Sequence, residues 1–406
     1  MISDLKGTFS NISNNIKRSA IREILKLTQN PEVISFAGGL PAPESFPVDN
    51  LDEIISTMLK EEGAEVLQYD ATEGVTELRE LLLKRYQNEG VQCELDNMIV
   101  TTGSQQGLDL VGKVFVNQGD VVICGLPSYL GGISAFQAYG AKMEGVPMDE
   151  NGMSAELLEA KLIELAEQGI KPKFIYIIPD FQNPTGITMP ESRRLEIIAL
   201  AHKYDVLIVE DCPYREVRFE GEPQRMMYDL DNDDHVMTLG TFSKTFAPGL
   251  RIGWILGPKE VNDKIVIAKQ SSDLCTPTFV QKMAIRYMKS EHFESNLKKT
   301  IDLYHQRRDV MLAEMEKCMP EGVKWTHPEG GMFLFITLPE NMDALELFHK
   351  AIEKKVAFVT GNVFYCDGGG TNTMRLNFSY VNNEKAIAGI QRLAQIIEAE
   401  MAVEAY

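Results

Sequence analysis

A lysine predicted to lie on a turn between two buried strands constrains this chain more than any other feature. Residues 241–254 read TFSKTFAPGLRIGW, and Lys244 is the lysine of that segment. Residues 236–239 before it and residues 252–256 at its end are apolar runs that are typical of short strands. The pattern therefore places Lys244 on a turn and not on a solvated helix face.

The neighbours of Lys244 suit an anion held beside an amine. Thr241, Ser243 and Thr245 carry hydroxyl groups, and Arg251 follows in the same segment. A lysine amine forms a Schiff base with a carbonyl compound once burial and a nearby cation lower its pKa, and arginine and hydroxyl donors bind phosphate. A carbonyl compound that also carries a phosphate indicates pyridoxal phosphate (PLP). The alternative at this point is a structural or solvent-facing lysine.

The size and charge of the chain limit its partners. With 406 residues it exceeds one typical domain, which predicts two. The net charge of −19 argues against nucleic acid and against anionic membranes as partners. The six cysteines show no paired spacing, so we expect no disulfide framework, no metal site and a cytoplasmic location. No secretory signal or membrane-spanning segment is expected, because no apolar run is long enough.

A candidate anion site follows the predicted strand at residues 98–101. Gly103, Ser104 and Gln105 come next, at the start of a predicted helix. Backbone N–H groups at such a helix start bind anions. The alternative is an ordinary turn in which Ser104 caps the helix.

Tyr129 and Asn183 follow predicted strands at residues 121–124 and 174–178. Doubly wound sheets bind ligands beyond the carboxyl ends of their strands, which makes both side chains candidates for a site. Pro184 fixes the backbone beside Asn183, whose amide both donates and accepts hydrogen bonds. The alternative for Tyr129 is a packing tyrosine.

Asp211 follows a further predicted strand at residues 206–209. A carboxylate at the end of a buried strand is costly unless it is paired. The protonated ring nitrogen of a pyridoxal cofactor is such a partner. Tyr214, three residues later, is placed to hydrogen-bond the ring oxygen of the same cofactor.

Three features near the N-terminus carry weaker signals. Residues 16–28 predict a short amphipathic helix with Arg22, which either covers a pocket or points into water. Gly39 lies in a loop rich in glycine and proline, where the backbone either approaches a ligand or only connects two elements. Tyr69 lies in a polar loop and, taken alone, is an ordinary surface tyrosine.

The C-terminal part predicts a second, smaller α/β layer. Residues 293–318 predict a long helix that links the two domains. The expected strands after it are residues 323–326, 332–338, 357–360 and 374–379. Arg375 lies on the last of these among apolar residues, so it needs an anionic partner, and a structural ion pair is the alternative to a ligand.

Together these motifs resemble the fold-type I PLP-dependent aminotransferases of class I/II. The motifs are Gly103-Ser104-Gln105, Tyr129, Asn183-Pro184-Thr185-Gly186, Asp211 with Tyr214, Ser243-Lys244 and Arg251. The segments SFAGGLP, FQNPTG and FSKTFAPGLRIGW are similar to the branch that holds 2-aminoadipate aminotransferase and kynurenine aminotransferase II. The resemblance covers nearly the whole chain. It implies an α/β fold in which a mostly parallel seven-stranded sheet lies between helices in a large domain, next to a smaller α/β domain.

The resemblance implies a role in cofactor binding for most of the candidate residues. Lys244 would join the cofactor aldehyde as a Schiff base and then move the proton at the substrate Cα, while Asp211 would keep the ring nitrogen protonated. Tyr214 and Asn183 would bond the ring oxygen, and Tyr129, counted with the catalytic residues, would stack on the ring. The cofactor phosphate would be held by Ser104, Gln105, Thr241, Ser243 and Arg251.

The same resemblance implies how substrates bind and how subunits assemble. Arg375 would clasp the substrate α-carboxylate, with Asn183 and Gly39 beside it, and Arg22 would meet the side-chain carboxylate of acidic substrates. Tyr69 would reach the phosphate of the neighbouring subunit, so a homodimer with shared active sites is implied. The expected domains are an N-terminal arm with part of the small domain (1–50), a large PLP-binding domain (51–292) and a small C-terminal domain (293–406).

The predicted function is ping-pong transfer of an amino group between an L-amino acid and a 2-oxo acid such as 2-oxoglutarate. The expected amino acids are 2-aminoadipate, glutamate, and aromatic or branched amino acids. Another PLP reaction, such as that of a β-lyase or decarboxylase, is an alternative because the same lysine and aspartate serve it. A PLP-sensing regulator is a further alternative, but only about forty residues precede the Gly-Gly loop and the acidic charge is wrong for DNA. Thr360 departs from the family, in which many relatives have proline before the glycine at Gly361.

Overall fold

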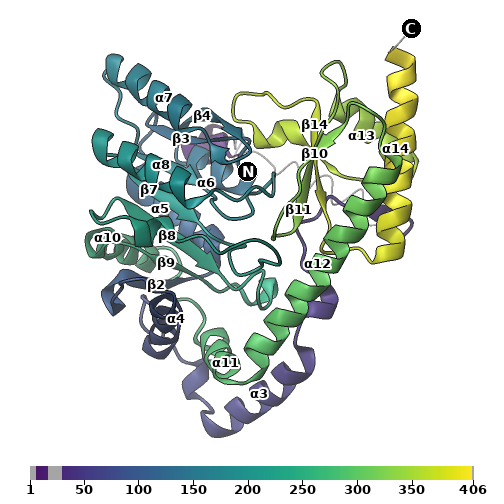
Figure 1. Cartoon of the computed structure of the whole chain (residues 1–406). Coiled ribbons are helices and arrows are strands. Elements are labelled where there is room, and N and C mark those ends of the chain that lie inside the picture. Colours follow the sequence, from purple (N-terminus) through teal and green to yellow (C-terminus); the bar gives the residue numbers. More distant parts are fainter. Residues whose placement is uncertain (1–5, 17–29, 405–406) are drawn as a thin grey trace.

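The computed structural model describes residues 6–16 and 30–404 and contains two main sheets (Figure 1). The larger sheet and its helices form the body at the left of Figure 1, and the smaller sheet lies at the right. The long helix α12 (His292–Cys318) runs from the lower part of the body to the smaller sheet, as residues 293–318 predict.

The larger sheet has eight strands in the order β2-β9-β8-β7-β6-β3-β4-β5. They are β2 (Met98–Thr101), β3 (Val121–Leu126), β4 (Lys142–Asp149), β5 (Gly152–Met153), β6 (Phe174–Ile177), β7 (Leu207–Asp211), β8 (Val236–Thr241) and β9 (Gly253–Leu256). Neighbours from β4 through β8 are parallel, whereas β9 is antiparallel to both β2 and β8. The expected mostly parallel sheet is confirmed. The expectation of seven strands misses β5, a two-residue antiparallel partner of β4 that is too short to leave a pattern.

Alternate strand residues pack against different sets of helices, because successive side chains point to opposite faces of a sheet. In β6, Phe174 and Tyr176 join the apolar cluster formed with α5 (Ser104–Phe115), α6 (Leu130–Ala138) and α10 (Lys259–Gln270). Ile175 and Ile177 join the cluster with α7 (Ala155–Glu167), α8 (Glu191–Tyr204) and α9 (Met227–Leu230). Burial on both faces explains why these strands have continuous apolar runs.

Strands β2 and β9, at one end of the larger sheet, pack against two further helices. These are α4 (Thr76–Asn88) and α11 (Thr278–Lys289), whose apolar side chains pack with Val100, Trp254 and Leu256. Helix α3 (Val48–Glu61) precedes α4 in the chain, and the remaining short helical elements are η1 (Lys6–Thr8), α1 (Asn11–Asn15), η2 (Pro43–Ser45), η3 (Glu65–Leu67), η4 (Leu95–Asn97), η5 (Pro248–Leu250) and η6 (Gly361–Phe364). Apart from Ile16, the predicted helix at residues 16–28, which includes Arg22, lies outside the described residues.

The smaller sheet is antiparallel, with the order β10-β11-β14-β13. Its strands are β10 (Lys324–Trp325), β11 (Phe333–Thr337), β13 (Val359–Thr360) and β14 (Thr373–Asn377). Apolar residues of α12, α13 (Ala344–Glu353) and α14 (Asn383–Glu404) pack with it. Strand β1 (Ile34–Ser35) pairs with β12 (Val356–Ala357), which ties an N-terminal segment to this C-terminal layer.

All six cysteines are free thiols, and four of them are buried. Within residues 6–16 and 30–404, no helix combines the length and the apolar character needed to cross a bilayer.

Candidate active site

Lys244 lies on the turn between β8 and β9, as predicted, and is half-buried. Its Nζ donates a hydrogen bond to the carbonyl oxygen of Gly39, 2.9 Å away. Burial lowers the pKa of Lys244 to about 8, and the positive charges of Arg375 and Arg251 act in the same direction. An amine with this pKa is partly neutral near pH 7, and the neutral form is the one that attacks a carbonyl carbon.

Asp211 ends β7 and is only 2% exposed. Its Oδ2 accepts a hydrogen bond of 2.8 Å from the hydroxyl of Tyr176, whereas its buried Oδ1 has no partner. Burial raises the pKa of Asp211 to about 7, against the lowering effect of the Tyr176 hydrogen bond. A cationic N–H group placed at Oδ1 would relieve this unfavourable burial, and the pyridinium nitrogen of a pyridoxal cofactor is such a group.

Asn183, Tyr214 and Arg375 form one buried hydrogen-bond network, although the sequence separates them widely. The amide Nδ2 of Asn183 donates to the Tyr214 hydroxyl over 3.4 Å. The guanidinium Nη1 of Arg375 donates to Asn183 Oδ1 over 2.9 Å. The network joins the loops after β6 and β7 to β14 of the smaller sheet, so residues of both sheets line one site.

Arg375 is 2% exposed and lies between two aromatic rings. Its Cζ is 4.1 Å from the ring centroid of Phe333 and 5.1 Å from that of Phe364. Nη2 donates to the carbonyl oxygen of Ala37 over 2.9 Å, whereas the buried Nε has no partner. Burial lowers the pKa of Arg375 to about 10. None of the described carboxylates forms an ion pair with Arg375, which leaves its charge free for an anionic ligand.

The start of α5 forms a cradle of backbone groups. Gly103 precedes the helix with φ 76°, and no side chain caps this helix N-terminus. A Cβ at Gly103 would lie 2.3 Å from Nη2 of Arg251, so the guanidinium packs directly on the glycine. A Cβ at Gly253 would lie 2.5 Å from the backbone nitrogen of Ser104. A cation beside free helical N–H groups is suited to a phosphate, as the sequence predicts.

Thr241 and Ser243 bring two hydroxyl groups to the same edge of the sheet. Their Oγ atoms are 2.9 Å apart, and Thr241 Oγ1 also donates to the carbonyl oxygen of Ile252 over 2.9 Å. Thr241 pairs with Gly253 across the sheet, and Gly253 touches the start of α5. The hydroxyl groups and the α5 cradle therefore lie near one another.

Tyr129 is half-buried and directly precedes α6. Its ring folds over Gly131, where a Cβ would lie 2.4 Å from Tyr129 Cζ. Burial is the main cause of the raised pKa of Tyr214, and Tyr129 adds to it, which indicates that the two phenols are close. The tyrosine therefore belongs with the network around Asp211 and Arg375.

For three predicted site residues, the structure does not place the side chain with the others. Tyr69 is 76% exposed in the loop after η3. The side chain of Gln105 is exposed and donates to the carbonyl oxygen of Gly131, so only its backbone faces the α5 cradle. Arg22 lies outside the described residues.

The structure adds residues to the site that the sequence patterns do not single out. Tyr176 holds Asp211, and Phe333 and Phe364 enclose Arg375. Tyr176 could have been noticed in the sequence, because its hydroxyl falls in the predicted buried strand at residues 174–178 and needs a hydrogen-bond partner. The structure pairs this strand with β7, which ends at Asp211. The carbonyl group of Ala37 left no signal, because a backbone acceptor is independent of residue type, whereas Gly39 was expected only as a place of close backbone approach.

The comparisons with known proteins show the family of the chain. Residues 36–393 match the family model described as aminotransferase class I and II. The chain is 47% identical over 400 residues to aromatic-amino-acid aminotransferase 1 of Thermococcus litoralis, covering 98% of this chain and 96% of that protein. It is 38% identical to 2-aminoadipate transaminase of Thermus thermophilus, with 97% and 98% covered.

A solved structure with similar geometry is that of Pyrococcus horikoshii kynurenine aminotransferase, in complex with PMP, KYN as substrates and KYA as products. Its TM-score is 0.95 at 45% identity, and the match covers 98% of this chain and 99% of that chain. Such coverage includes nearly the whole fold. The protein thus belongs to the aminotransferase class I and II family, with a fold-type I structure.

Proposed function

We propose that this chain moves an amino group between an L-amino acid and a 2-oxo acid such as 2-oxoglutarate by a ping-pong reaction at Lys244. The proposed amino acids are 2-aminoadipate, glutamate, and aromatic or branched amino acids. The names of the relatives support the aromatic amino acids and 2-aminoadipate, since they include an aromatic-amino-acid aminotransferase, a 2-aminoadipate transaminase and a kynurenine aminotransferase. The observation that carries the proposal is a partly neutral lysine in the same site as a buried carboxylate with one unpaired oxygen.

We propose that the residues of this site hold PLP, the cofactor that the family implies. Asp211 Oδ1 would hold the ring nitrogen in its protonated form, and Asn183 and Tyr214 would bond the ring oxygen. The phosphate would be held by Ser104, Gln105, Thr241, Ser243 and Arg251. When bound, the cofactor supplies an electron-withdrawing ring that stabilises negative charge at the substrate Cα.

The chain itself would move the proton and orient the reacting groups. Lys244 would carry the cofactor and, once released from it, take the proton from the substrate Cα and return it. Tyr129 would cover the ring face and limit the access of water. Because the pKa of Lys244 is lowered, its amine can serve as a base near neutral pH.

We infer that Arg375 binds the substrate α-carboxylate, with Asn183 and Gly39 close by. Its unpartnered Nε and the absence of an ion pair with any described carboxylate support this role. The proposed role of Arg22 in reading acidic side chains rests on the sequence alone.

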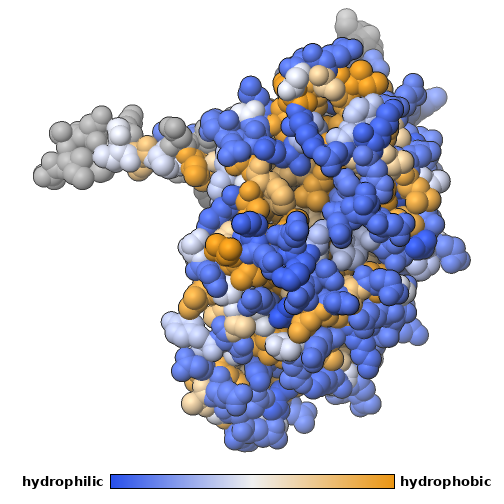
Figure 2. Space-filling model, turned by 90° about the vertical axis from the view of Figure 1, so that its left-hand side faces the viewer, coloured by the Kyte–Doolittle hydropathy of each residue, from blue (hydrophilic) through white to orange (hydrophobic). Residues whose placement is uncertain are grey.

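A homodimer with shared sites is part of the proposal, with Tyr69 reaching the partner's phosphate. Eight of the 15 exposed large hydrophobic residues of the described chain fall within its first 69 residues: Phe9, Ile12, Ile16, Leu40, Val48, Leu59, Leu67 and Tyr69. Figure 2 shows one face, mostly hydrophilic with several hydrophobic patches, the broadest of them in its upper middle part. The N-terminal concentration favours a partner subunit there.

We further propose the domain division 1–50, 51–292 and 293–406, and a cytoplasmic location. The apolar cluster that joins Ile34 and Phe36 with α12, α13 and α14 supports assigning the N-terminal segment to the small domain. The six free thiols fit a reducing compartment.

A half-reaction panel tests the proposed function. Purified protein with PLP is mixed with each of the common amino acids and 2-aminoadipate, and the loss of cofactor absorbance is followed. Aminotransfer predicts that added 2-oxoglutarate restores the starting spectrum and yields glutamate. A lyase or decarboxylase would instead release pyruvate with ammonia, or carbon dioxide, without needing a 2-oxo acid. A PLP-sensing regulator would bind the cofactor without turnover.

A further inference from the structure

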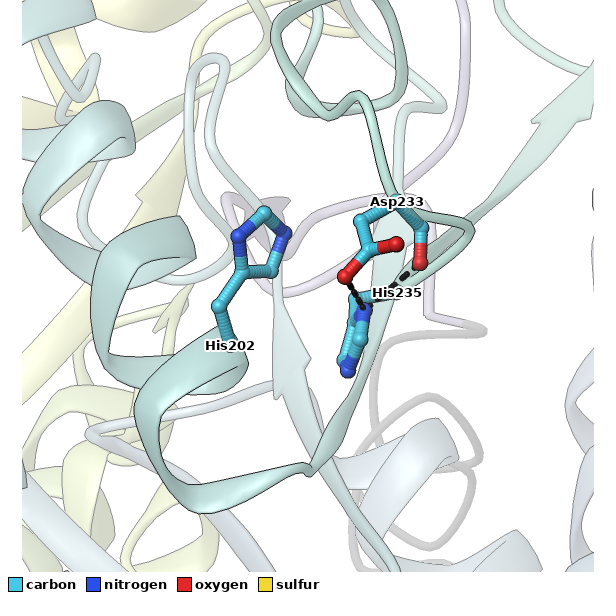
Figure 3. Close-up of side chains that lie close together, drawn as sticks. All are labelled: His202, Asp233 and His235. Atoms are coloured by element: carbon cyan, nitrogen blue, oxygen red, sulfur yellow. Dashed lines mark hydrogen bonds and ion pairs between the residues drawn. The ribbon is translucent and has the colours of Figure 1, made fainter.

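Two histidines and an aspartate face a common space at the amino end of β8, the end opposite to the Lys244 turn. His202 lies in the last turn of α8, and Asp233 and His235 lie in the loop between α9 and β8 (Figure 3). One ring nitrogen of each histidine and one carboxylate oxygen of Asp233 all lie within 4.8 Å of one another. The ring centroids of His202 and His235 are 4.7 Å apart. No step of the proposed reaction uses these residues.

Two more carboxylates surround the histidines. Asp231 Oδ1 is 2.6 Å from His202 Nε2, and Asp205 Oδ1 is 3.4 Å from His235 Nε2. Asp231 is held in place, because its oxygens accept backbone N–H groups of Asp233, His235 and Val236. The loop that carries Asp233 and His235 is therefore fixed against the end of α8.

We propose that His202, Asp233 and His235 bind one divalent transition-metal ion, such as Zn²⁺, Co²⁺ or Ni²⁺. Imidazole nitrogens and carboxylates are the ligands these ions prefer, whereas Mg²⁺ and Ca²⁺ prefer oxygen ligands alone. Zinc binds nitrogen and oxygen at about 2.0–2.2 Å in a tetrahedral arrangement, so two ligand atoms of one ion lie roughly 3.4 Å apart. The observed limit of 4.8 Å exceeds this separation, so the ligand atoms must approach one another by about 1.4 Å when the ion binds. His202 and Asp233 are exposed and His235 is half-buried, which leaves their side chains room to rotate toward a common ion.

Bound metal would tie the C-terminal end of α8 to the start of β8 and leave further coordination positions to water. The three ligand residues are brought together only in the folded chain, so metal binding would stabilise the native state. The nearby cation Lys171 is paired with Asp205 and therefore does not neutralise Asp233.

The described residues contain one other group with suitable ligand atoms, formed by Glu220, His305 and Asp309. It is less suited to a transition metal, since it has a single imidazole. Arg308 already binds both oxygens of Glu220, at 2.8 and 2.5 Å. This group supplies a matched control.

The test is a metal titration of the PLP-bound enzyme after removal of metal with EDTA. We expect calorimetry and elemental analysis to show one equivalent of Zn²⁺ bound per chain, and thermal unfolding to shift upward with Zn²⁺. The affinity should fall at least ~10-fold in His202→Ala and again in the His202→Ala/His235→Ala double variant. His305→Ala should bind as the unaltered protein does, and excess Mg²⁺ should not displace Zn²⁺.

Co²⁺ gives a second readout that is independent of activity, because its absorption spectrum reports nitrogen and oxygen ligands. All variants should retain their amino-transfer rates, which also shows that they fold. The proposal is overturned if the unaltered enzyme binds no stoichiometric Zn²⁺ or Co²⁺. It is equally overturned if the double variant binds the metal as tightly as the unaltered enzyme, or if His305→Ala abolishes binding.

Discussion

Replacing Asp211 by asparagine should stabilise the cofactor-free protein, although it removes a charge that the reaction is proposed to need. Asp211 is 2% exposed, and burial raises its pKa from 3.8 to about 7. The difference of about 3 pKa units corresponds to about 4 kcal/mol of unfavourable interaction for the ionised form, at about 1.4 kcal/mol per unit. An asparagine carries no charge and can still accept the hydrogen bond of Tyr176.

The sign of the pH dependence follows from which state holds the proton. Below pH 3.8 the carboxyl is protonated in both the folded and the unfolded chain. Between pH 3.8 and about 7 the folded chain keeps the proton and the unfolded chain releases it, so the free energy of unfolding falls as the pH rises. The total fall from this group is about 4 kcal/mol and is complete above pH 7. The Asp211→Asn variant lacks this pH-dependent fall in the free energy of unfolding.

The assay is urea unfolding of cofactor-free protein between pH 4.5 and 7.5, and the titration of Lys244, whose pKa is about 8, is common to both proteins and cancels in their difference. At pH 7.5 the free energy of unfolding of the variant should exceed that of the unaltered protein by about 1–3 kcal/mol. The gain is smaller than about 4 kcal/mol because burying the amide N–H₂ without a partner costs about 1–3 kcal/mol. At pH 4.5 the advantage should vanish. Asp180→Asn is the matched control: Asp180 is 1% exposed but lies 2.7 Å from Arg194, so its loss should cost about 3–5 kcal/mol. A lower free energy of unfolding for Asp211→Asn than for the unaltered protein at pH 7.5, or a difference that does not depend on pH, would show that burial does not raise the pKa of Asp211.

Further predictions concern the other proposed ligands. Arg375→Lys should lower kcat/KM for all amino acids by the equivalent of roughly 2–5 kcal/mol, because lysine cannot form the planar fork; unchanged kcat/KM would contradict the assignment. Gly103→Ala should cost about 1–3 kcal/mol of stability, because a Cβ at φ 76° meets Arg251, and should weaken phosphate binding; normal PLP affinity would argue against the α5 cradle. Tyr69→Phe should raise the Kd for PLP by roughly 10- to 100-fold if its hydroxyl bonds the partner's phosphate. Arg22→Ala should reduce kcat/KM for glutamate far more than for leucine, and equal effects on both substrates would remove Arg22 from the substrate site.

Local sequence signals predict the elements of this fold well. Lys244 lies on the turn expected from the apolar runs on either side, and Asp211 lies at the strand end where a carboxylate is costly. The α5 cradle follows from a glycine and small polar residues between a strand and a helix. In each case the signal is contained in about ten neighbouring residues.

Contacts between distant segments are not predictable from such signals. Arg375 meets Asn183, 192 residues away, and Lys244 meets Gly39, 205 residues away. These contacts depend on how β14 and the N-terminal loop pack beside the large sheet. Hydrogen bonds to backbone carbonyl groups, such as those of Ala37 and Gly39, are also hard to predict from sequence, because every residue carries such a group. The resemblance to a known family supplied the association that local patterns lacked.

The most direct test of the account is to find which residue PLP joins covalently. Protein saturated with PLP is reduced with borohydride, digested and mapped by mass spectrometry. We expect one pyridoxyl-phosphate adduct per chain, on Lys244, and none in Lys244→Ala, which should also fail to turn over. An adduct on another lysine, or a Lys244→Ala variant that retains amino transfer, would contradict it.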